Sequence, residues 1–228
     1  MKITYLGHAA FSLEHDGATV LIDPFLTGNP KATVSADSLA ADTILLTHGH
    51  ADHYGDVIGI AQRTGATVGA IVELAEEISG DLGGDHEVVD FNLGGTIALP
   101  WGTAKLVPAW HTSTTPKGTV NTPAGLLIDI GGTLVYHLGD TSLFSDLRLV
   151  APRDRQIDVA LMCIGGHYTM DRHDAVIAAD LVGARQVVPC HYDTFPAIET
   201  DAEAFKHDVE MDTASEVVVL DPGETHAP

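Results

Sequence analysis

Short stretches in which apolar and polar residues alternate dominate the first half of the chain. Asp16-Gly17 between two such stretches is typical of a tight β-hairpin. Longer apolar stretches such as residues 43–47 are typical of strands buried on both faces. The pattern predicts strands at residues 2–6, 10–14, 18–23, 43–47, 67–71, 88–90, 96–99, 105–109, 125–130, 133–138, 159–163, 186–190 and 216–220.

Helical periodicity is confined to four segments. We expect helices at residues 56–64, 72–79, 171–182 and 201–211. Residues 171–182 form the clearest amphipathic pattern, with Ala175, Ile177, Ala178 and Leu181 on one side. Strands with interspersed helices, followed by strand–helix alternation, predict an α+β fold of two mixed sheets packed face to face with outer helices. We expect one domain over residues 1–228 because no linker interrupts the pattern.

Metal-binding side chains are concentrated directly after the strand predicted at residues 43–47. The run His48-Gly49-His50-Ala51-Asp52-His53 contains three imidazoles and a carboxylate, which are ligands for Zn, Mn or Fe. If the strand geometry continues, His48 and His50 point the same way, and Asp52 and His53 lie on the following turn. One short segment could therefore serve two metal ions.

Three further candidate ligands follow predicted strands elsewhere. His111 follows residues 105–109, Asp140 follows residues 133–138, and His191 follows residues 186–190. Histidines of a packed core have no reason to recur at strand ends, whereas convergent ligands do. The expected metal ligands are His48, His50, Asp52, His53, His111, Asp140 and His191. Asp140 is the natural bridge, because its two oxygens can reach two ions.

The order of these ligands resembles the metallo-β-lactamase superfamily, whose motif H-x-H-x-D-H is followed by a His, a bridging Asp and a final His. The segments YLGHAAFSLE, LIDPFLTGNP, HLGDTSLF, IGGHYTMDRHDA and VVPCHYDTFP resemble more narrowly the UPF0173 metal-dependent hydrolases, related to the ascorbate-6-phosphate lactonase-like branch. The resemblance implies a four-layer αββα sandwich, a dinuclear site and hydrolytic chemistry. The chain departs from the family pattern at Gly166, where Asp is frequent, and at Cys190, where Met is frequent.

The expected reaction is the attack of a bridging hydroxide on an ester, lactone or phosphoester. Two divalent ions, with zinc as the first expectation and manganese or iron as alternatives, would activate the water. Asp52 would orient it, and His167 would protonate the leaving group or contact the oxyanion. The alternative for His167 is a loop histidine that makes only a structural hydrogen bond. His8 and Asp23 are expected to hold ligands from behind. The alternative is a non-catalytic metal-binding or regulatory module of the same fold.

Charge and cysteine content narrow the class of partner. The chain has 11 Lys and Arg against 32 Asp and Glu, a net charge of −21, which disfavours nucleic acid and anionic membranes as partners. Asp supplies 22 of the acids and Lys only 5 of the bases, as in halophilic proteins.

An N-terminus without the apolar region of a signal peptide and two buried-strand cysteines predict a cytoplasmic protein. We expect a small-molecule substrate; whether the chain forms a homo-oligomer is left open.

Overall fold

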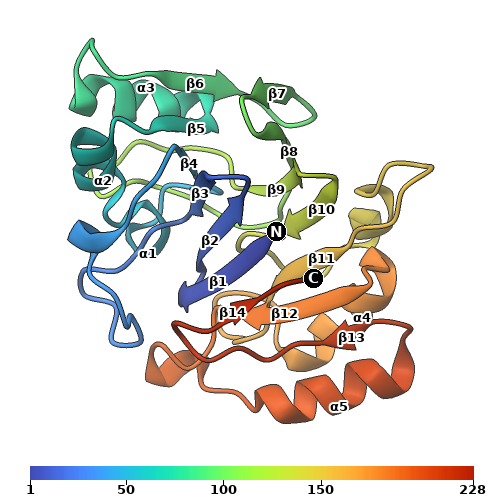
Figure 1. Cartoon of the computed structure of the whole chain (residues 1–228). Helices are drawn as coiled ribbons and strands as arrows, with labels where there is room; N and C mark the ends of the chain where they lie inside the picture. The colour runs from blue at the N-terminus through green and yellow to red at the C-terminus, as the bar shows by residue number, and fades with distance from the viewer.

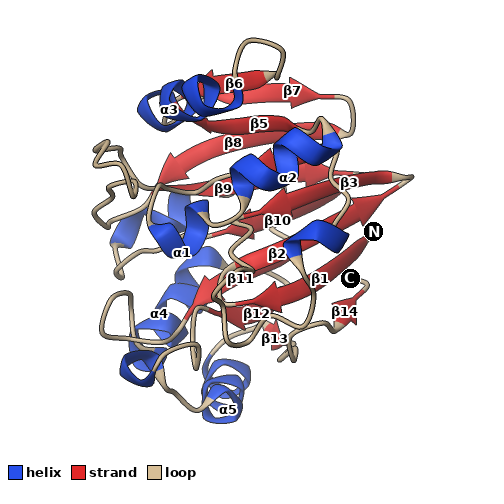
Figure 2. Cartoon of the chain, turned by 90° about the vertical axis from the view of Figure 1, so that its left-hand side faces the viewer, coloured by secondary structure: helices blue, strands red, loops and turns tan.

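The structure, a computed structural model, describes all residues from 1 to 228 and contains two seven-stranded sheets that lie face to face (Figures 1 and 2). The first sheet has the strand order β14 (Thr225–His226), β1 (Lys2–Gly7), β2 (Ala10–His15), β3 (Ala18–Ile22), β4 (Thr43–Leu45), β5 (Thr67–Ile71) and β6 (Val88–Phe91). The second has the order β13 (Glu216–Val217), β12 (Gln186–Cys190), β11 (Val159–Cys163), β10 (Thr133–His137), β9 (Ala124–Ile130), β8 (Gly102–Pro108) and β7 (Thr96–Leu99). Both sheets are mixed, as the sequence predicts.

Helices cover the outer sides of the two sheets. The α-helices are α1 (Ala51–Tyr54), α2 (Val57–Thr64), α3 (Val72–Leu82), α4 (Arg172–Val182) and α5 (Ala202–Asp212), and the short 3-10 helices are Ala36–Ser38, Ser145–Leu149 and Pro196–Ile198. In Figure 2, α2 and α3 lie over the first sheet, and α4 and α5 lie by the second. The predicted four-layer αββα sandwich is confirmed.

The direction of the strands explains where functional side chains gather. In the first sheet β1 and β3 both run antiparallel to β2, and β4 runs parallel to β3. In the second sheet β8 and β10 both run antiparallel to β9, and β11 and β12 run parallel to β10. The carboxyl ends of β1, β3 and β4 therefore share one edge of the first sheet. Those of β8, β10, β11 and β12 share one edge of the second.

Alternation along the strands divides the core into two clusters. Val135 faces the space between the sheets, whereas its neighbours Leu134 and Tyr136 face the helices on the outer side of the second sheet. The larger cluster joins the inner faces of both sheets and extends to α2 and α3. The smaller cluster lies between the second sheet and α4 and α5. Both sheets are thus anchored by packing on either side, which gives the strand ends a rigid support.

The structure corrects several sequence-based boundaries. The strand predicted at residues 43–47 ends at Leu45, and the strand predicted at residues 216–220 ends at Val217. Asp171 and Asp201 precede α4 and α5 as N-caps that accept backbone N–H groups, because an aspartate there satisfies donors that the helix leaves free. Ile177 lies outside the buried face of α4 and is 52% exposed, since Ala175, Ala178, Ala179 and Val182 make up that face.

The ends of the chain lie near each other. β14 pairs with β1 at the edge of the first sheet, so that His226 is opposite Ile3 (Figure 1). This short last strand was not predicted. No helix is both long enough and apolar enough to span a membrane.

Candidate metal centre

The loop after β4 carries the histidine run, and Gly49, between His48 and His50, is tightly packed. The N–H of Gly49 donates to Ser113 Oγ at 2.9 Å and to Asn121 Oδ1 at 3.1 Å. A Cβ atom on Gly49 would lie 2.6 Å from Asn121 Nδ2 and 2.8 Å from Thr115 Cγ2. The glycine between the two histidines is therefore required by the loop of residues 113–121 that covers it.

The histidine run ends in a helix rather than in a turn. His50 has extended backbone angles and is the N-cap of α1, which carries Asp52 and His53. The prediction that Asp52 and His53 lie on a turn was wrong, because α1 begins at Ala51. The start of this short helix divides the run into two pairs of side chains. His48 and His50 lie before the helix, and Asp52 and His53 lie on it.

Two groups of four side chains gather at the sheet edge, and in each group the ligand atoms lie within 4.8 Å of one another. The first group consists of His48, His50, His111 and Asp140, and the second group consists of His8, Asp52, His53 and His191. All seven predicted ligands are thus brought together, with His8 as an eighth member.

Distances within the first group are those of side chains that converge on one point. His48 Nε2 lies 3.0 Å from His50 Nδ1, and His111 Nε2 lies 3.5 Å from Asp140 Oδ2. The rings of His48 and His111 are edge to face at 5.4 Å between their centroids. His50 and His111 are partly exposed, so this group faces solvent.

The second group touches the first through Asp140. Asp140 Oδ1 lies 3.3 Å from His53 Nε2, and Asp140 Oδ2 lies 3.1 Å from His191 Nε2. Because Asp140 Oδ2 is also within reach of His111, this carboxylate lies between the two groups. The bridging role expected from the sequence stays a prediction, which this position favours.

Asp23 holds two of the histidines from behind. Its Oδ2 accepts the Nδ1–H of His53 at 2.8 Å and the hydroxyl of Thr47 at 2.6 Å, and its Oδ1 accepts the N–H of Thr47 at 2.8 Å. The Thr47 hydroxyl in turn lies 3.0 Å from His48 Nδ1 and, having given its hydrogen to Asp23, accepts from that nitrogen. Sequence reasoning missed Thr47, although it directly precedes His48.

The donor set fits divalent cations. His53 Nε2, His191 Nε2 and Asp140 Oδ1 are buried and have no hydrogen-bond partner. Because the Nδ1–H of His53 is given to Asp23, the Nε2 atom of the neutral ring presents a lone pair to an Asp140 oxygen that also presents lone pairs. Buried acceptors that face each other are costly unless a proton or a metal ion lies between them. Imidazole and carboxylate are ligands of Zn, Mn and Fe.

Burial and mutual charge shift the pKa values of these groups in opposite directions. Burial lowers the pKa of His48 well below its ordinary value and that of His8 to about 4, so both rings are neutral. Burial also opposes protonation of His53, but Asp140 and Asp23 together raise its pKa above the usual range. Burial raises the pKa of Asp140, yet His191 and His53 hold it well below the usual value. The Asp140 carboxylate is therefore ionised.

Four predicted site residues have left-handed backbone angles. The φ angles are 60° at His8, 46° at Asp23, 57° at His167 and 54° at His191. Such angles are uncommon for residues other than glycine and cost of order 1–3 kcal/mol each. His8, Asp23 and His191 each directly follow the end of a strand, where the chain turns and the side chain joins or contacts the grouped residues, whereas His167 lies on the loop after β11. No sequence pattern reveals this strain.

His167 lies on the loop between β11 and α4, beside the centre. The loop is tied down where Met170 N–H donates to Thr141 O at 3.0 Å and Gly166 N–H donates to Met170 O at 3.1 Å. The His167 side chain is exposed and packs edge to face against Tyr168, with centroids 4.5 Å apart. No hydrogen bond or ion pair joins it to the eight grouped residues.

Two other polar residues, His137 and Lys117, have structural contacts. His137 is buried, donates from Nε2 to Ala9 O at 2.9 Å and accepts from Gly139 N–H at 3.0 Å. It fastens the turn that carries His8 to the loop that carries Asp140. Lys117 forms an ion pair with Asp81 of α3.

A surface pocket of about 610 Å³ lies away from the centre. It is lined by the β2–β3 turn, by the starts of β4 and β5, and by Trp101 and Gly131. None of the eight grouped residues lines it. We assign the chemistry to the grouped side chains rather than to this cavity, because it contains no convergent set of ligands.

Comparison with known proteins gives full-length matches. A family model described as the beta-lactamase superfamily domain matches residues 2–191. A UPF0173 metal-dependent hydrolase of Carboxydothermus hydrogenoformans is 44% identical over 227 residues, covering 98% of each chain. One of Methanopyrus kandleri is 45% identical over 231 residues, covering 99% of each. The solved structure of Igni18, a metallo hydrolase of Ignicoccus hospitalis, superposes with a TM-score of 0.88 at 38% identity and covers 99% of this chain and 97% of its own.

Proposed function

Because this chain belongs to the UPF0173 metal-dependent hydrolases of the beta-lactamase superfamily, we propose that it hydrolyses a small-molecule ester, lactone or phosphoester at a dinuclear centre. The observation that carries the proposal is the position of Asp140. Its oxygens lie 3.1 Å from His191 Nε2, 3.3 Å from His53 Nε2 and 3.5 Å from His111 Nε2. One carboxylate can thus serve both groups of ligands.

The seven proposed ligands would bind the two ions in two sets. His48, His50 and His111 would hold the first ion, Asp52, His53 and His191 would hold the second, and Asp140 would contribute to both. When bound, two divalent ions supply a bridging hydroxide as nucleophile and stabilise the oxyanion of the transition state. Zinc suits the His/Asp donor set best, and manganese or iron are the alternatives.

Proton handling is assigned to Asp52 and His167. Asp52 lies at the opening, with its side chain about one-third exposed, where an oxygen that is not used as a ligand can orient the attacking water. His167 stands on the neighbouring exposed loop and protonates the leaving group. Its exposure suits a group that must meet a departing product and then regain a proton from solvent.

The competing proposal is a non-catalytic metal-binding or regulatory module. The test is to load the protein with Zn²⁺ or Mn²⁺, measure metal content by elemental analysis, and assay lactones, aryl esters and phosphodiesters. Hydrolysis that falls at least about 100-fold in Asp52→Ala, and is retained in Asp85→Ala on the exposed α3–β6 loop, supports the enzyme. A fully loaded protein inert towards the whole panel supports the module.

We further propose that the protein is cytoplasmic, that it is related to the ascorbate-6-phosphate lactonase-like branch, and that its origin is halophilic. Cys163 and Cys190 are both free and buried, which suits the reducing cytoplasm. Kinship with the ascorbate-6-phosphate lactonase-like branch is a prediction about substrate type, and the assay panel, with its lactones, bears on it directly. The surplus of aspartate over lysine supports a halophilic origin.

A further inference from the structure

His8 lies in the turn between β1 and β2 and is fully buried. Its carbonyl oxygen accepts the N–H of His191 at 2.7 Å and the hydroxyl of Tyr5 at 3.1 Å. The left-handed backbone at His8 turns the ring toward the second group. The turn is thus fastened to the backbone of a ligand, which fixes the ring of His8 relative to the ring of His191.

The ring of His8 converges with the second group. Its Nε2 lies 3.1 Å from Asp52 Oδ2, and its centroid lies 4.1 Å from that of His191. Two ligand atoms that are each about 2.1 Å from one ion lie about 3.0 Å apart at a right angle and about 3.4 Å apart at a tetrahedral angle, so the 3.1 Å spacing is compatible with two atoms that share an ion. With His8 included, each group contains three imidazoles and one carboxylate.

The other ring nitrogen of His8 already has a partner. Nδ1 lies 2.8 Å from Thr194 Oγ1, and the Thr194 hydroxyl donates to Tyr192 O at 3.4 Å. If the hydroxyl gives its hydrogen to the carbonyl, it accepts the Nδ1–H of His8. Nε2 then carries a lone pair that faces the lone pairs of Asp52, and a cation between them resolves the conflict.

The same construction occurs twice more in this centre. His53 gives its Nδ1–H to Asp23, and His48 gives its Nδ1–H to Thr47, and in both the Nε2 atom turns to the metal position. A histidine whose far nitrogen donates to a carboxylate or hydroxyl is the usual form of a metal ligand. His8 with Thr194 has this form.

We propose that His8 is an eighth protein ligand and binds the second ion together with Asp52, His53 and His191. The inference rests on the proposed dinuclear centre. The rival arrangement has the other tautomer, in which Thr194 donates to Nδ1 and His8 Nε2–H donates to Asp52. In that arrangement His8 only orients Asp52.

Nuclear magnetic resonance separates the two arrangements without any variant. The ¹⁵N-labelled protein is loaded with ¹¹³Cd²⁺, and the imidazole of His8 is identified by sequential assignment. The proposal expects a coupling between ¹¹³Cd and His8 Nε2 and a proton on Nδ1. A proton on Nε2 without coupling to ¹¹³Cd overturns it.

The same sample keeps this inference distinct from the proposed function. Two ¹¹³Cd resonances per chain support the dinuclear centre, and one resonance at saturation contradicts it. Coupling to His8 in either case supports His8 as a ligand, and its absence in either case overturns that role.

Variants give a second readout through metal affinity. In competition with a chelator, His8→Gln is expected to weaken binding of the second ion at least 100-fold and to spare the first. Thr194→Val is expected to weaken it about 10- to 100-fold, with recovery in Thr194→Ser. The control His207→Ala removes an exposed imidazole of α5 and leaves both affinities unchanged. Equal loss at both ions in His8→Gln would indicate a general structural role and overturn the proposal.

Discussion

Asp23 and His53 form a fully buried pair in which the carboxylate accepts the Nδ1–H at 2.8 Å. Asp23 also accepts the hydroxyl of Thr47, so one carboxylate determines the orientation of His53 directly and of His48 through Thr47. The two histidines belong to different groups of ligands. A single residue behind the centre therefore orients one histidine of each group.

Asp23→Asn is expected to weaken the binding of both ions by about 10- to 100-fold, because the amide cannot accept from His53 and Thr47 as a carboxylate does. Zinc titration against a chelator measures the two affinities. Asp16→Asn in the exposed β2–β3 turn is the matched control and should leave them unchanged. Wild-type affinities in Asp23→Asn would contradict the role of Asp23.

Gly49→Ala is expected to lower the free energy of unfolding by about 1–3 kcal/mol, because the added Cβ overlaps Asn121 and Thr115. Urea denaturation measures the change. Gly59→Ala in α2 is the control: nothing lies within 4 Å of its added Cβ, and helix propensity should raise stability by about 0.5–1 kcal/mol. Equal effects of the two substitutions would rule out the packing argument.

His167→Gln is expected to reduce kcat by about 10²- to 10⁴-fold while metal content stays at the wild-type value, because the side chain touches no ligand. Steady-state kinetics and elemental analysis on the same preparation test this. His207→Gln should retain wild-type kcat. An unchanged kcat in His167→Gln on every accepted substrate would remove His167 from the mechanism.

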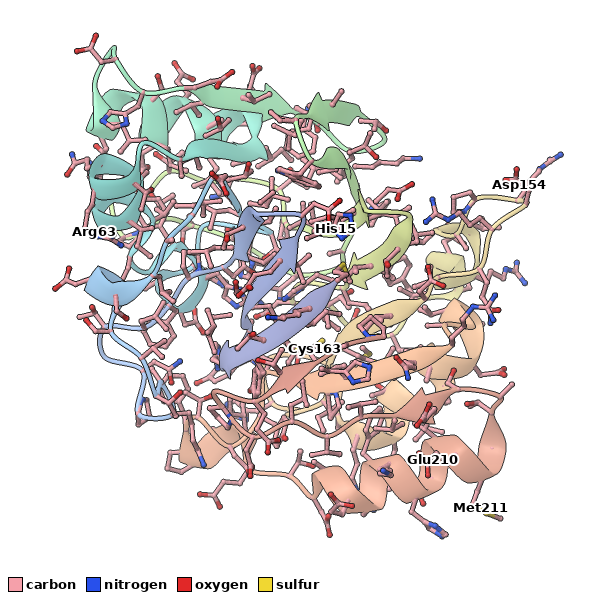
Figure 3. The ribbon with its side chains drawn as sticks, in the orientation of Figure 1. His15, Arg63, Asp154, Cys163, Glu210 and Met211 are labelled. Atoms are coloured by element: carbon pink, nitrogen blue, oxygen red, sulfur yellow. The ribbon has the colours of Figure 1, made fainter.

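The two thiols are expected to be inert in the folded protein. Burial raises the pKa of Cys163 to about 12 and raises that of Cys190 well above its ordinary value, so both stay protonated at pH 8. Figure 3 labels Cys163, which lies in the interior, 1% exposed. A chromogenic disulfide reagent should titrate no thiol before denaturation and two after it. Rapid reaction of either thiol in the native protein would be the contrary result.

Salt is expected to stabilise the protein. With a net charge of −21, self-repulsion is strong at low ionic strength and screened at high ionic strength. Thermal unfolding and hydrolytic activity, measured from low salt to multimolar KCl, should both improve. Flat curves across that range would contradict a halophilic origin.

The sequence predicted the sandwich and the seven ligands because both depend on local patterns. Strand periodicity is written along each strand, and every proposed ligand follows a strand end at a recognisable spacing. The resemblance to the metallo-β-lactamase motif then indicated that the seven residues together bind metal. The αββα architecture is confirmed, and the ligand roles stay predictions whose geometry is favourable.

The contributions that sequence reasoning missed depend on distant contacts. The role of Thr194 depends on its contact with His8, which is 186 residues away in the chain. The roles of Ser113 and Asn121 depend in the same way on their hydrogen bonds with Gly49. The short helix α1 was missed because four residues carry no periodicity. The exposure of Ile177 depends on where α5 and the second sheet pack against α4, which the pattern of α4 alone does not contain.

The ligands come from both sheets. His8, His48, His50, Asp52 and His53 follow strands of the first sheet, whereas His111, Asp140 and His191 follow strands of the second. Neither sheet alone carries all four side chains of either group: the first sheet lacks two members of the first group and one member of the second. We therefore expect tight metal binding only in chains whose two sheets have packed on each other. Bound metal would then stabilise the closed sandwich relative to partly folded chains.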